Sequence, residues 1–323
     1  MNKDASKIVC PYSMPQKKLA APDFYAFCNG GLGVSPGTVR RDIESWLNED
    51  HGAGDATLFS AFQNNVEMCM YIVAKETFIL SGLHIMAEVF RLAGSPEIAI
   101  FSNFADGQEV LKGEIILGAK GQAAALLLAE RVALNLGSRM SGVTTKTKFV
   151  QTSLQQAFKS SNSNIKCPVL LETRKTTPGL RMYEKYATRV GGARNHRHGL
   201  DSGCMLKENH LRSIGNIKTA IQILKERIPI LTKIEVEVTN LDEFKVALSE
   251  QADVIMLDNF SLEEVRKAVE VRNKSGIGAK LELSGNLDLK NIEDIANCGV
   301  DYASMGALIH KASWVDMSLQ LYP

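Results

Sequence analysis

The fold of this 323-residue chain is decided by residues 233–257, which read KIEVEVTNLDEFKVALSEQADVIML. Two short apolar runs of strand length, Lys233–Val238 and Ala252–Leu257, flank a segment with helical spacing, Leu241–Ser249. Parallel strands cannot be joined by a tight turn, and a helix supplies the crossover between them. The stretch therefore predicts a β-α-β unit within a parallel sheet.

The same alternation occupies the chain from about Lys166 onward. Six such units without a glycine-rich dinucleotide turn favour an α/β barrel over an open doubly wound sheet. At one junction Ser261 is placed to cap a helix, with Glu264 completing a capping box. The expected strands are Pro168–Glu172, Gly203–Lys207, Lys233–Val238, Ala252–Leu257, Lys280–Leu283 and Val300–Met305, and the expected helices are Leu180–Arg189, Asn216–Arg227, Leu241–Ser249, Leu262–Lys274 and Asp288–Ala296.

The first half of the chain has a mixed pattern. Residues 1–40 are rich in Pro, Gly and Asn, which predicts a loosely ordered extension, and their Gly31-x-Gly33 run lacks the third glycine of a dinucleotide fingerprint. Residues 41–143 are expected to form an α+β domain ahead of a barrel over 144–310, with a surface loop at Phe149–Lys166. The expected helices are Arg41–Asn48, Glu76–Leu92 and Gln122–Met140, and the β-like runs are Glu97–Phe101 and Glu114–Leu117.

Composition limits the class of protein. The chain has 37 Lys and Arg against 36 Asp and Glu, for a formal charge of +1, which argues against nucleic-acid or anionic-membrane partners. Six scattered cysteines without a CxxC pair indicate reduced thiols, and the N-terminal residues lack the apolar core of a signal peptide. The longest apolar stretches, Thr77–Ala87 and Gly121–Ala129, fall short of the ~20 residues that a membrane span needs. We therefore expect a cytoplasmic protein.

Polar residues follow the expected strands at their carboxyl ends. In an α/β barrel this rim collects catalytic residues, and loops after the last strands commonly bind a phosphate. Serine and glycine amides at a helix start favour such an anion. The strand-end residues are Arg174 and Lys175, Lys207, Glu235 and Glu237, Asp258, Ser284 and Gly285, and Gly306 with His310 shortly after.

A glycine-rich loop, residues 191–199, adds cationic or protonatable groups that include His196 and Arg197. With Arg174, Lys175 and Lys207 it predicts a positive pocket for a ligand with several negative charges, because unpaired buried cations are costly. Separately, each group could be a solvated turn residue, and Glu235 with Glu237 an exposed strand face.

Two kinds of metal site are conceivable in this half of the chain. A zinc site from His196, His198, Cys204 and His210 matches no known spacing, and Arg197 between two of these residues would oppose a cation. Glu237 and Asp258 are better candidates for Mg²⁺ held jointly with substrate phosphates.

Several long motifs together resemble quinolinate phosphoribosyltransferase from about residue 41 to the C-terminus. In the first half these are Glu49-Asp50-x-Gly52-x-Gly54-Asp55-x-Thr57, Glu130-Arg131-x-Ala133-Leu134-Asn135 and Ser141-Gly142. In the second half they are Thr173-Arg174-Lys175-Thr176-Thr177-Pro178-Gly179-x-Arg181, Glu184-Lys185-Tyr186, Gly191-Gly192-x-x-Asn195-His196-Arg197-x-Gly199-Leu200 and Leu206-Lys207-Glu208-Asn209-His210.

The resemblance implies an incomplete TIM-like barrel with an N-terminal open-faced α+β sandwich, onto which residues 311–323 pack back. It implies transfer of phosphoribose from phosphoribosyl pyrophosphate to quinolinate, with loss of CO2 and pyrophosphate, to give nicotinate mononucleotide for NAD biosynthesis. The resemblance also implies that Mg²⁺ is required and that no organic cofactor is needed. It implies a homodimer with shared active sites, or a higher oligomer of such dimers.

The resemblance also assigns roles to the polar residues. Quinolinate would be bound by Arg174, His196, Arg197 and Lys207, with Arg131 reaching in from the partner subunit. Lys175 would act at the reacting centre, and Glu237 and Asp258 would lie by the ribose and Mg²⁺. Ser284, Gly285 and Gly306 would bind the 5-phosphate, and His310 the polyphosphate end.

The chain departs from the family pattern in a few places, and other functions stay open. Ala193 replaces a common glycine, Glu172 stands where Asp is frequent, and residues 1–40 are longer than usual. The alternatives are a paralogue acting on another substrate, such as the pyrophosphorylase-like proteins found beside molybdate transport genes, a nicotinate-specific phosphoribosyltransferase, or an anion-binding scaffold without activity.

Overall fold

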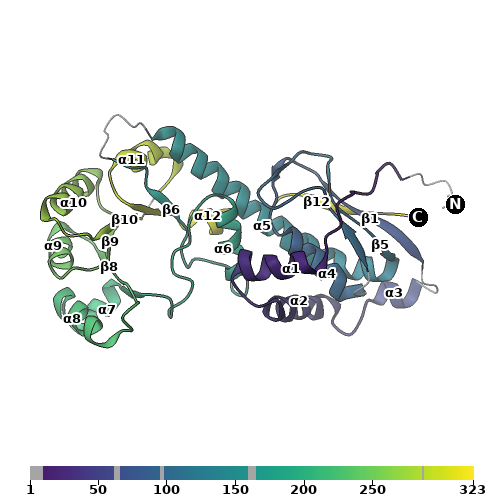
Figure 1. Cartoon of the computed structure of the whole chain (residues 1–323), viewed down its shortest axis with the longest axis horizontal. Coiled ribbons are helices and arrows are strands. Elements are labelled where there is room, and N and C mark those ends of the chain that lie inside the picture. Colours follow the sequence, from purple (N-terminus) through teal and green to yellow (C-terminus); the bar gives the residue numbers. More distant parts are fainter. Residues whose placement is uncertain (1–9, 62–65, 95–97, 159–164, 286) are drawn as a thin grey trace. The chain divides into compact units, whose positions relative to one another are not determined.

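The computed structural model describes residues 10–61, 66–94, 98–158, 165–285 and 287–323 (Figure 1). The chain divides into two compact units. The first comprises Met1–Lys146, Met182–Gly191 and Ala312–Pro323, and the second comprises Thr147–Arg181 and Gly192–Lys311. Among the described helices, none is both long enough and apolar enough to cross a membrane.

The second unit is built on a six-stranded sheet in the order β6-β11-β10-β9-β8-β7, and every neighbouring pair is parallel. Each predicted strand is present, with shorter or shifted ends. The strands are β6 (Val169–Leu171), β7 (Cys204–Leu206), β8 (Ile234–Val238), β9 (Val254–Asp258), β10 (Lys280–Ser284) and β11 (Tyr302–Ser304). The helices that follow these strands are α7 (Glu208–Ile214), α8 (Ile217–Arg227), α9 (Leu241–Ser249), α10 (Leu262–Ser275), η3 (Leu289–Asn291), α11 (Ile292–Asn297) and α12 (Ala307–His310).

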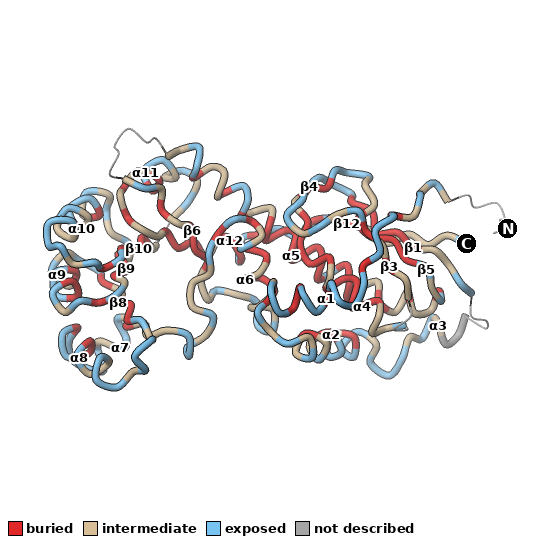
Figure 2. Tube along the Cα trace, in the orientation of Figure 1, coloured by how far each residue is buried: buried red, intermediate tan, exposed pale blue. Residues whose placement is uncertain are grey.

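Side-chain caps fix where these helices begin. Asn216 accepts the Thr219 N–H at the start of α8, and Asn240 accepts two N–H groups at the start of α9. The predicted capping box of α10 is confirmed: Ser261 Oγ accepts the Glu264 N–H at 3.3 Å, and Glu264 Oε2 accepts the Ser261 N–H at 2.9 Å. Each capped helix then covers the sheet with its apolar face, and Figure 2 shows the buried residues along β8, β9 and β10.

The barrel is open between β6 and β7. Neighbouring strands in the sheet order run from β6 through β11 to β7, and no ladder joins the two ends in the described part of the chain. A single parallel bridge between Leu171 and Arg194 brings the loop that precedes β7 beside β6. The crossover helix expected here, α6 (Arg181–Val190), belongs almost wholly to the first unit, so the loop and not a helix lies along this seam.

The first unit contains an antiparallel sheet in the order β12-β1-β5-β3. The C-terminal strand pairs with β1, with Tyr322 opposite Cys69, which corresponds to the expected return of residues 311–323. Its strands are β1 (Glu67–Ala74), β3 (Ala99–Phe101), β5 (Ile115–Gln122) and β12 (Met317–Tyr322), with a separate pair β2 (Phe78–Ile79) and β4 (Glu109–Val110). Its helices are α1 (Ala21–Ala26), η2 (Phe27–Leu32), α2 (Pro36–His51), α3 (Ala56–Ala61), α4 (Leu83–Gly94) and the first part of α5 (Ala123–Ala157).

Two expectations about disorder and loops were wrong for the described residues. The segment before residue 40 contains α1, η2 and the start of α2, and Phe24 and Cys28 are fully buried. The Pro and Gly content of this segment suggested a loop, although its apolar side chains pack into the core. Helix α5 also runs on to Ala157, through the first part of the stretch that was expected to be a surface loop. The rest of that stretch, residues 159–164, lies outside the described residues.

The two units do not follow the contiguous division into residues 41–143 and 144–310. Residues Met182–Gly191 of α6 join the first unit. There Arg139 of α5 donates to Glu184 at 2.7 Å, and Thr144 donates to the Ala187 carbonyl at 2.9 Å. Glu184 has no solvent exposure, so this buried pair ties α6 to α5. Such long-range pairing is not readable from helical spacing alone.

Candidate active site

The carboxyl ends of the parallel strands surround a cavity of about 510 Å³ in the second unit. In register, Asp258 at the end of β9 lies opposite Ser284 at the end of β10. Residues from five of the six strands and from the two loops beside the seam point into the same space. The lining residues are Thr173, Arg174, Lys175, His196, Arg197, Met205, Lys207, Glu237, Met256, Asp258, Glu282, Ser284 and Ser304.

A second cavity of about 220 Å³ adjoins the first, because Thr173, Lys175, Ser284 and Ser304 line both. It contains Gly285, Gly306 and His310, which follow β10 and β11. Gly285 has a φ of +89°, and a Cβ there would lie 2.2 Å from Asn259 Oδ1. A Cβ on Gly306 would lie 3.1 Å from Lys175 Cδ. Gly285 therefore permits a close approach that a side chain would block, whereas a side chain at Gly306 would require its neighbours to shift slightly.

The larger of these two cavities concentrates positive charge. The Nε atoms of Arg174 and Arg197 are buried and have no hydrogen-bond partner among the described residues. Desolvation lowers the pKa of Arg197, and the nearby charge of Arg174 lowers it further. Two guanidinium groups in one cavity repel each other unless an anion lies between them. The arrangement is therefore prepared for a ligand with more than one negative charge.

Acidic groups line the same cavity as these cations. Lys207 Nζ forms a close ion pair with Glu237 Oε2. Asp258 is half-buried, and its Oδ2 accepts a hydrogen bond from Asn259 Nδ2 at 2.8 Å. The second oxygen of each carboxylate can face a sugar hydroxyl or a hard cation such as Mg²⁺. The cavity thus offers cations for an anion and two carboxylates for a centre that becomes positive.

A further acidic group lies at the floor, around His196. Its Nε2 lies 3.1 Å from Glu235 Oε2 and 3.5 Å from Glu282 Oε2, and its Nδ1 accepts the Arg197 N–H at 2.8 Å. Burial raises the pKa of Glu282 to about 7, and the charge of Glu235 adds to the rise. One ligand atom from each of the three residues lies within 4.8 Å of the others, a spacing that could hold a metal ion.

The zinc site considered from His196, His198, Cys204 and His210 does not form. Among the described residues, the group with metal-ligand spacing joins His196 to two carboxylates and includes none of the other three. The exposed His210 accepts the Lys207 N–H through Nδ1 at 3.1 Å, at the start of α7. This hydrogen bond at the start of α7 accounts for the position of the His210 ring.

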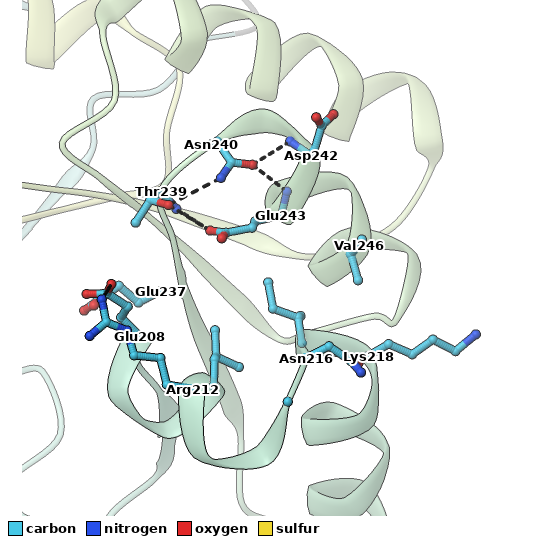
Figure 3. A pocket seen from close by; sticks show the side chains of 13 residues that line it. Glu208, Arg212, Asn216, Lys218, Glu237, Thr239, Asn240, Asp242, Glu243 and Val246 are labelled. Carbon is cyan, nitrogen blue, oxygen red and sulfur yellow. Dashed lines mark hydrogen bonds and ion pairs between the residues drawn. The ribbon is translucent and has the colours of Figure 1, made fainter.

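A cavity of about 760 Å³ lies between α7, α8 and α9, and shares Glu237 with the strand-end cavity (Figure 3). Its polar groups satisfy one another: Arg212 pairs with Glu208, and Glu243 accepts the Thr239 N–H at 2.8 Å. Four of its charged lining residues are acidic and two are basic, which disfavours a polyanion despite the larger volume. The acids are Glu208, Glu237, Asp242 and Glu243, and the bases are Arg212 and Lys218.

The two adjoining cavities bring together every predicted site residue except one. Arg131 lies on α5 in the first unit and is exposed. The sequence reasoning missed Glu282, which has 1% exposure, together with Thr173 and Ser304. The sequence places Glu282 on the same strand face as Ser284, but it lies inside its run and nothing else distinguishes it from an ordinary strand residue. The predicted residues in the cavities are Arg174, Lys175, His196, Arg197, Lys207, Glu237, Asp258 and Ser284 in the larger, and Gly285, Gly306 and His310 in the smaller.

Comparison with known proteins identifies the family. The model of the quinolinate phosphoribosyl transferase C-terminal domain matches residues 150–320, and that of the N-terminal domain matches residues 55–141. The chain belongs to the quinolinate phosphoribosyltransferase family. Within the family, a probable carboxylating nicotinate-nucleotide pyrophosphorylase of Synechocystis sp. is 38% identical over 282 residues, covering 86% of this chain and 91% of the relative.

Solved structures of the family share the fold of this chain. The nicotinate-nucleotide pyrophosphorylase from Francisella tularensis is similar with a TM-score of 0.80 and 36% identity, covering 90% of this chain and 98% of that one. A probable carboxylating relative from Bacillus subtilis is 38% identical over 284 residues, 88% of this chain and 93% of its own. The predicted fold class, an incomplete α/β barrel with an α+β domain, is confirmed by these relatives.

Proposed function

We propose that this chain transfers phosphoribose from phosphoribosyl pyrophosphate to quinolinate and releases CO2, which makes nicotinate mononucleotide for NAD biosynthesis. The observation that carries the proposal is that the buried Nε–H groups of Arg174 and Arg197 lie in one cavity and have no hydrogen-bond partner among the described residues. Relatives at 34–38% identity are named as carboxylating nicotinate-nucleotide pyrophosphorylases, which supports the same reaction.

Quinolinate carries two adjacent carboxylates on a pyridine ring, and the cation cluster suits that shape. Planar guanidinium groups bind carboxylates through two parallel hydrogen bonds, which orients the ring as well as holding it. Lys207 adds a third cation, although its ion pair with Glu237 must loosen for the ammonium to reach a substrate carboxylate. Lys175 lines both cavities, which supports a role for it between the proposed quinolinate end and the proposed phosphate end.

The smaller cavity is proposed to bind the 5-phosphate and polyphosphate end of the second substrate. Gly285 and Gly306 leave room for an anion against the backbone, and Ser284 and His310 offer donors. Glu237 and Asp258 would hold Mg²⁺ together with the substrate's own oxygens, since Mg²⁺ prefers hard oxygen ligands and both carboxylates supply them. Bound there, Mg²⁺ would neutralise charge on the departing pyrophosphate.

The reaction needs no organic cofactor, because the substrates and the residues of this cavity account for every bond that forms or breaks. The ring nitrogen of quinolinate forms a bond to C1 of the ribose as the bond from C1 to pyrophosphate breaks. The carboxylates of Glu237 and Asp258 stabilise the positive charge that develops on the sugar. The ring nitrogen is then cationic, so the C2–carboxylate bond can break with its electrons held beside that charge, and C2 finally takes up a proton.

Assembly and compartment belong to the same proposal. An active site completed by Arg131 of a second copy would make the working unit a homodimer. The exposed position of Arg131 on α5 supports a contact outside its own unit. All six cysteines lie in the described residues and are free thiols, which supports a reducing, cytoplasmic setting.

An assay of the purified chain tests the proposal. Quinolinate, phosphoribosyl pyrophosphate and Mg²⁺ are supplied together, and pyrophosphate and CO2 are measured against a parallel reaction with nicotinate. We expect equal amounts of pyrophosphate and CO2 with quinolinate, and at most a hundredth of that turnover with nicotinate. Equal turnover of both pyridines would identify a nicotinate enzyme and contradict the proposal.

A further inference from the structure

The imidazole of His196 links the floor of the cavity to its cation cluster. Its Nδ1 accepts the backbone N–H of Arg197 at 2.8 Å, so the ring proton lies on Nε2. Nε2 in turn faces Glu235 on β8 at 3.1 Å and Glu282 on β10 at 3.5 Å. The ring orientation and the backbone of Arg197 are therefore fixed by the same two carboxylates.

The position of this link in the barrel is unusual. His196 comes from the loop that lies along the open seam between β6 and β7, and its ring reaches β8, which neighbours β7, and β10, which is two strands from β6. The loop is held at a second point by Glu172, which accepts the His196 N–H at 3.2 Å and the Asn195 side-chain amide at 3.3 Å. A loop that carries a substrate-binding arginine is thus anchored at three strands.

Burying Glu235 and Glu282 lowers the stability of the folded chain, so their presence calls for a functional explanation. Glu282, which lines the cavity, is 1% exposed, and Glu235, which lies beside it, is 8% exposed. Two neighbouring carboxylates in a dry interior lower stability relative to apolar side chains of similar size. Their contact with one imidazole is the feature that sets them apart from an ordinary apolar barrel layer.

We propose that Glu235 and Glu282 are positioning residues for quinolinate, which hold His196 and, through it, Arg197 in the orientation that receives the substrate carboxylates. This inference rests on the proposed function, and it adds to it two residues whose role is exerted through His196 and not through the chemistry of the reaction. It also separates the roles of Glu235 and Glu237 on one face of β8, because Glu235 contacts His196 whereas Glu237 lines the cavity.

The test compares a volume-conserving replacement with one that keeps the acceptor oxygen. Glu282→Met is expected to weaken quinolinate binding, measured by titration calorimetry, at least tenfold, while the KM for phosphoribosyl pyrophosphate changes less than twofold. Glu282→Gln retains an oxygen for Nε2–H and is expected to stay within about threefold of the wild type. We expect the same weakening of quinolinate binding for Glu235→Met. This variant is used for the test if Glu282→Met does not fold.

A double-mutant cycle separates positioning from general loss of structure. If Glu282 acts through His196, Glu282→Met should weaken quinolinate binding less than twofold in a His196→Ala background. The matched control is Asp301→Asn, which removes a carboxylate from the opposite end of the barrel, where it pairs with Arg272 and Lys280. We expect that variant to unfold at a lower temperature and to bind quinolinate as the wild type does.

Several results would overturn the inference. They are additive effects in the cycle, equal weakening for both substrates, or a quinolinate affinity unchanged by both methionine variants. A wild-type chain that binds quinolinate without turnover would overturn the proposed function and leave this positioning role supported by the cycle. A wild-type chain that does not bind quinolinate would overturn both.

Discussion

At the scale of single residues, the site depends on unlike charges placed a few ångströms apart. Arg174 and Arg197 present buried N–H groups without partners among the described residues, while Glu237 pairs closely with Lys207. Cations alone would bind any anion, and carboxylates alone would repel one. Together they favour a ligand that is a dianion at one end and becomes cationic at the sugar.

The guanidinium geometry of Arg174 and Arg197 gives the first prediction. Arg174→Lys and Arg197→Lys keep the charge but lose the planar fork, so each should raise the KM for quinolinate by about 10- to 100-fold, equivalent to about 1.5–3 kcal/mol. Steady-state kinetics with quinolinate as the varied substrate measures this. The control is Arg194→Lys, because Arg194 is exposed and lines neither cavity. A tenfold effect of the control, or none of either variant, would contradict the assignment.

The raised pKa of Glu282, about 7 against an ordinary value of 4.5, gives a second prediction at this scale. Between these values the folded chain holds a proton that the unfolded chain has lost, so this group's contribution is most favourable below pH 4.5 and is lost as the pH rises through 7. His196, Glu235 and the Ser304 hydroxyl face this carboxyl group.

Urea unfolding at several pH values checks this linkage. Glu282→Gln should flatten the fall in unfolding free energy between pH 5 and pH 8, with a change of up to about 3 kcal/mol across the range. The exposed Glu226→Gln serves as the control and should leave the slope unaltered. Parallel pH curves for the wild type and Glu282→Gln would show that the carboxyl group titrates normally.

Residues at strand ends could be predicted from the sequence, whereas Glu282 could not be separated from an ordinary strand residue. Arg174, Lys207 and Asp258 lie at the ends of apolar runs or within two residues of them, so their place at the rim follows from strand direction alone. Glu282 lies inside its run, and its role depends on a loop that arrives from 86 residues earlier in the chain at His196. No local pattern encodes that meeting.

At the scale of elements, the turn after β10 shapes the smaller cavity. Gly285 adopts a φ of +89°, and Asn259 after β9 also has a positive φ, of 56°. The Asn259 N–H donates to the Ser284 carbonyl at 3.1 Å, which joins the ends of the two strands. The backbone is thereby kept close to the space proposed for the phosphate.

Replacing Gly285 tests this turn. Gly285→Ala combines strain at positive φ with a Cβ 2.2 Å from Asn259 Oδ1, so we expect about 1–2 kcal/mol of lost stability and a KM for phosphoribosyl pyrophosphate raised at least tenfold. Gly276→Ala is the matched control: its φ is +69°, but nothing lies within 4 Å of the new Cβ. It should lose about 1 kcal/mol with unchanged kinetics. Similar KM values for both variants would mean that the turn does not shape the phosphate site.

Elements with strong periodicity were predicted well, and those that depend on distant partners were not. All six barrel strands and the helices between β8 and β10 are where alternation placed them. Strands β1 and β12 were missed because each is stabilised by the other across most of the chain. The expected helix Glu76–Leu92 is instead β2 followed by α4, since Gly82 interrupts it with a φ of +89°.

At the scale of the whole molecule, the second unit alone lacks one predicted site residue, Arg131. If Arg131 serves the active site of a partner subunit, Arg131→Ala and Lys175→Ala should each be inactive, and co-refolded mixtures should recover up to about a quarter of wild-type activity. The recovery follows because one site of each mixed dimer keeps both wild-type residues. An Arg131→Ala and Arg131→Lys mixture is the control for refolding losses. Mixed dimers shown to form without recovering activity would rule out a shared site.

The division of the chain into two units could not be fully predicted from the sequence. Alternation predicted a barrel and a mixed domain, but the assignment of α6 and β12 to the first unit depends on contacts such as Arg139 with Glu184. The family resemblance supplied the reaction, since no arrangement of charges by itself distinguishes quinolinate from another dianion of similar size. The positions and charges of the cavity residues indicate the kind of ligand and where it binds.

The central claim is most directly tested with quinolinate labelled with ¹³C in its 2-carboxylate. The chain, phosphoribosyl pyrophosphate and Mg²⁺ are incubated with this substrate, and the label is followed by mass spectrometry in the gas and in the nucleotide product. We predict that all label lost from quinolinate appears as CO2, in equal amount to pyrophosphate, with unlabelled nicotinate mononucleotide. Label retained in the nucleotide, or CO2 released without pyrophosphate, would contradict the account.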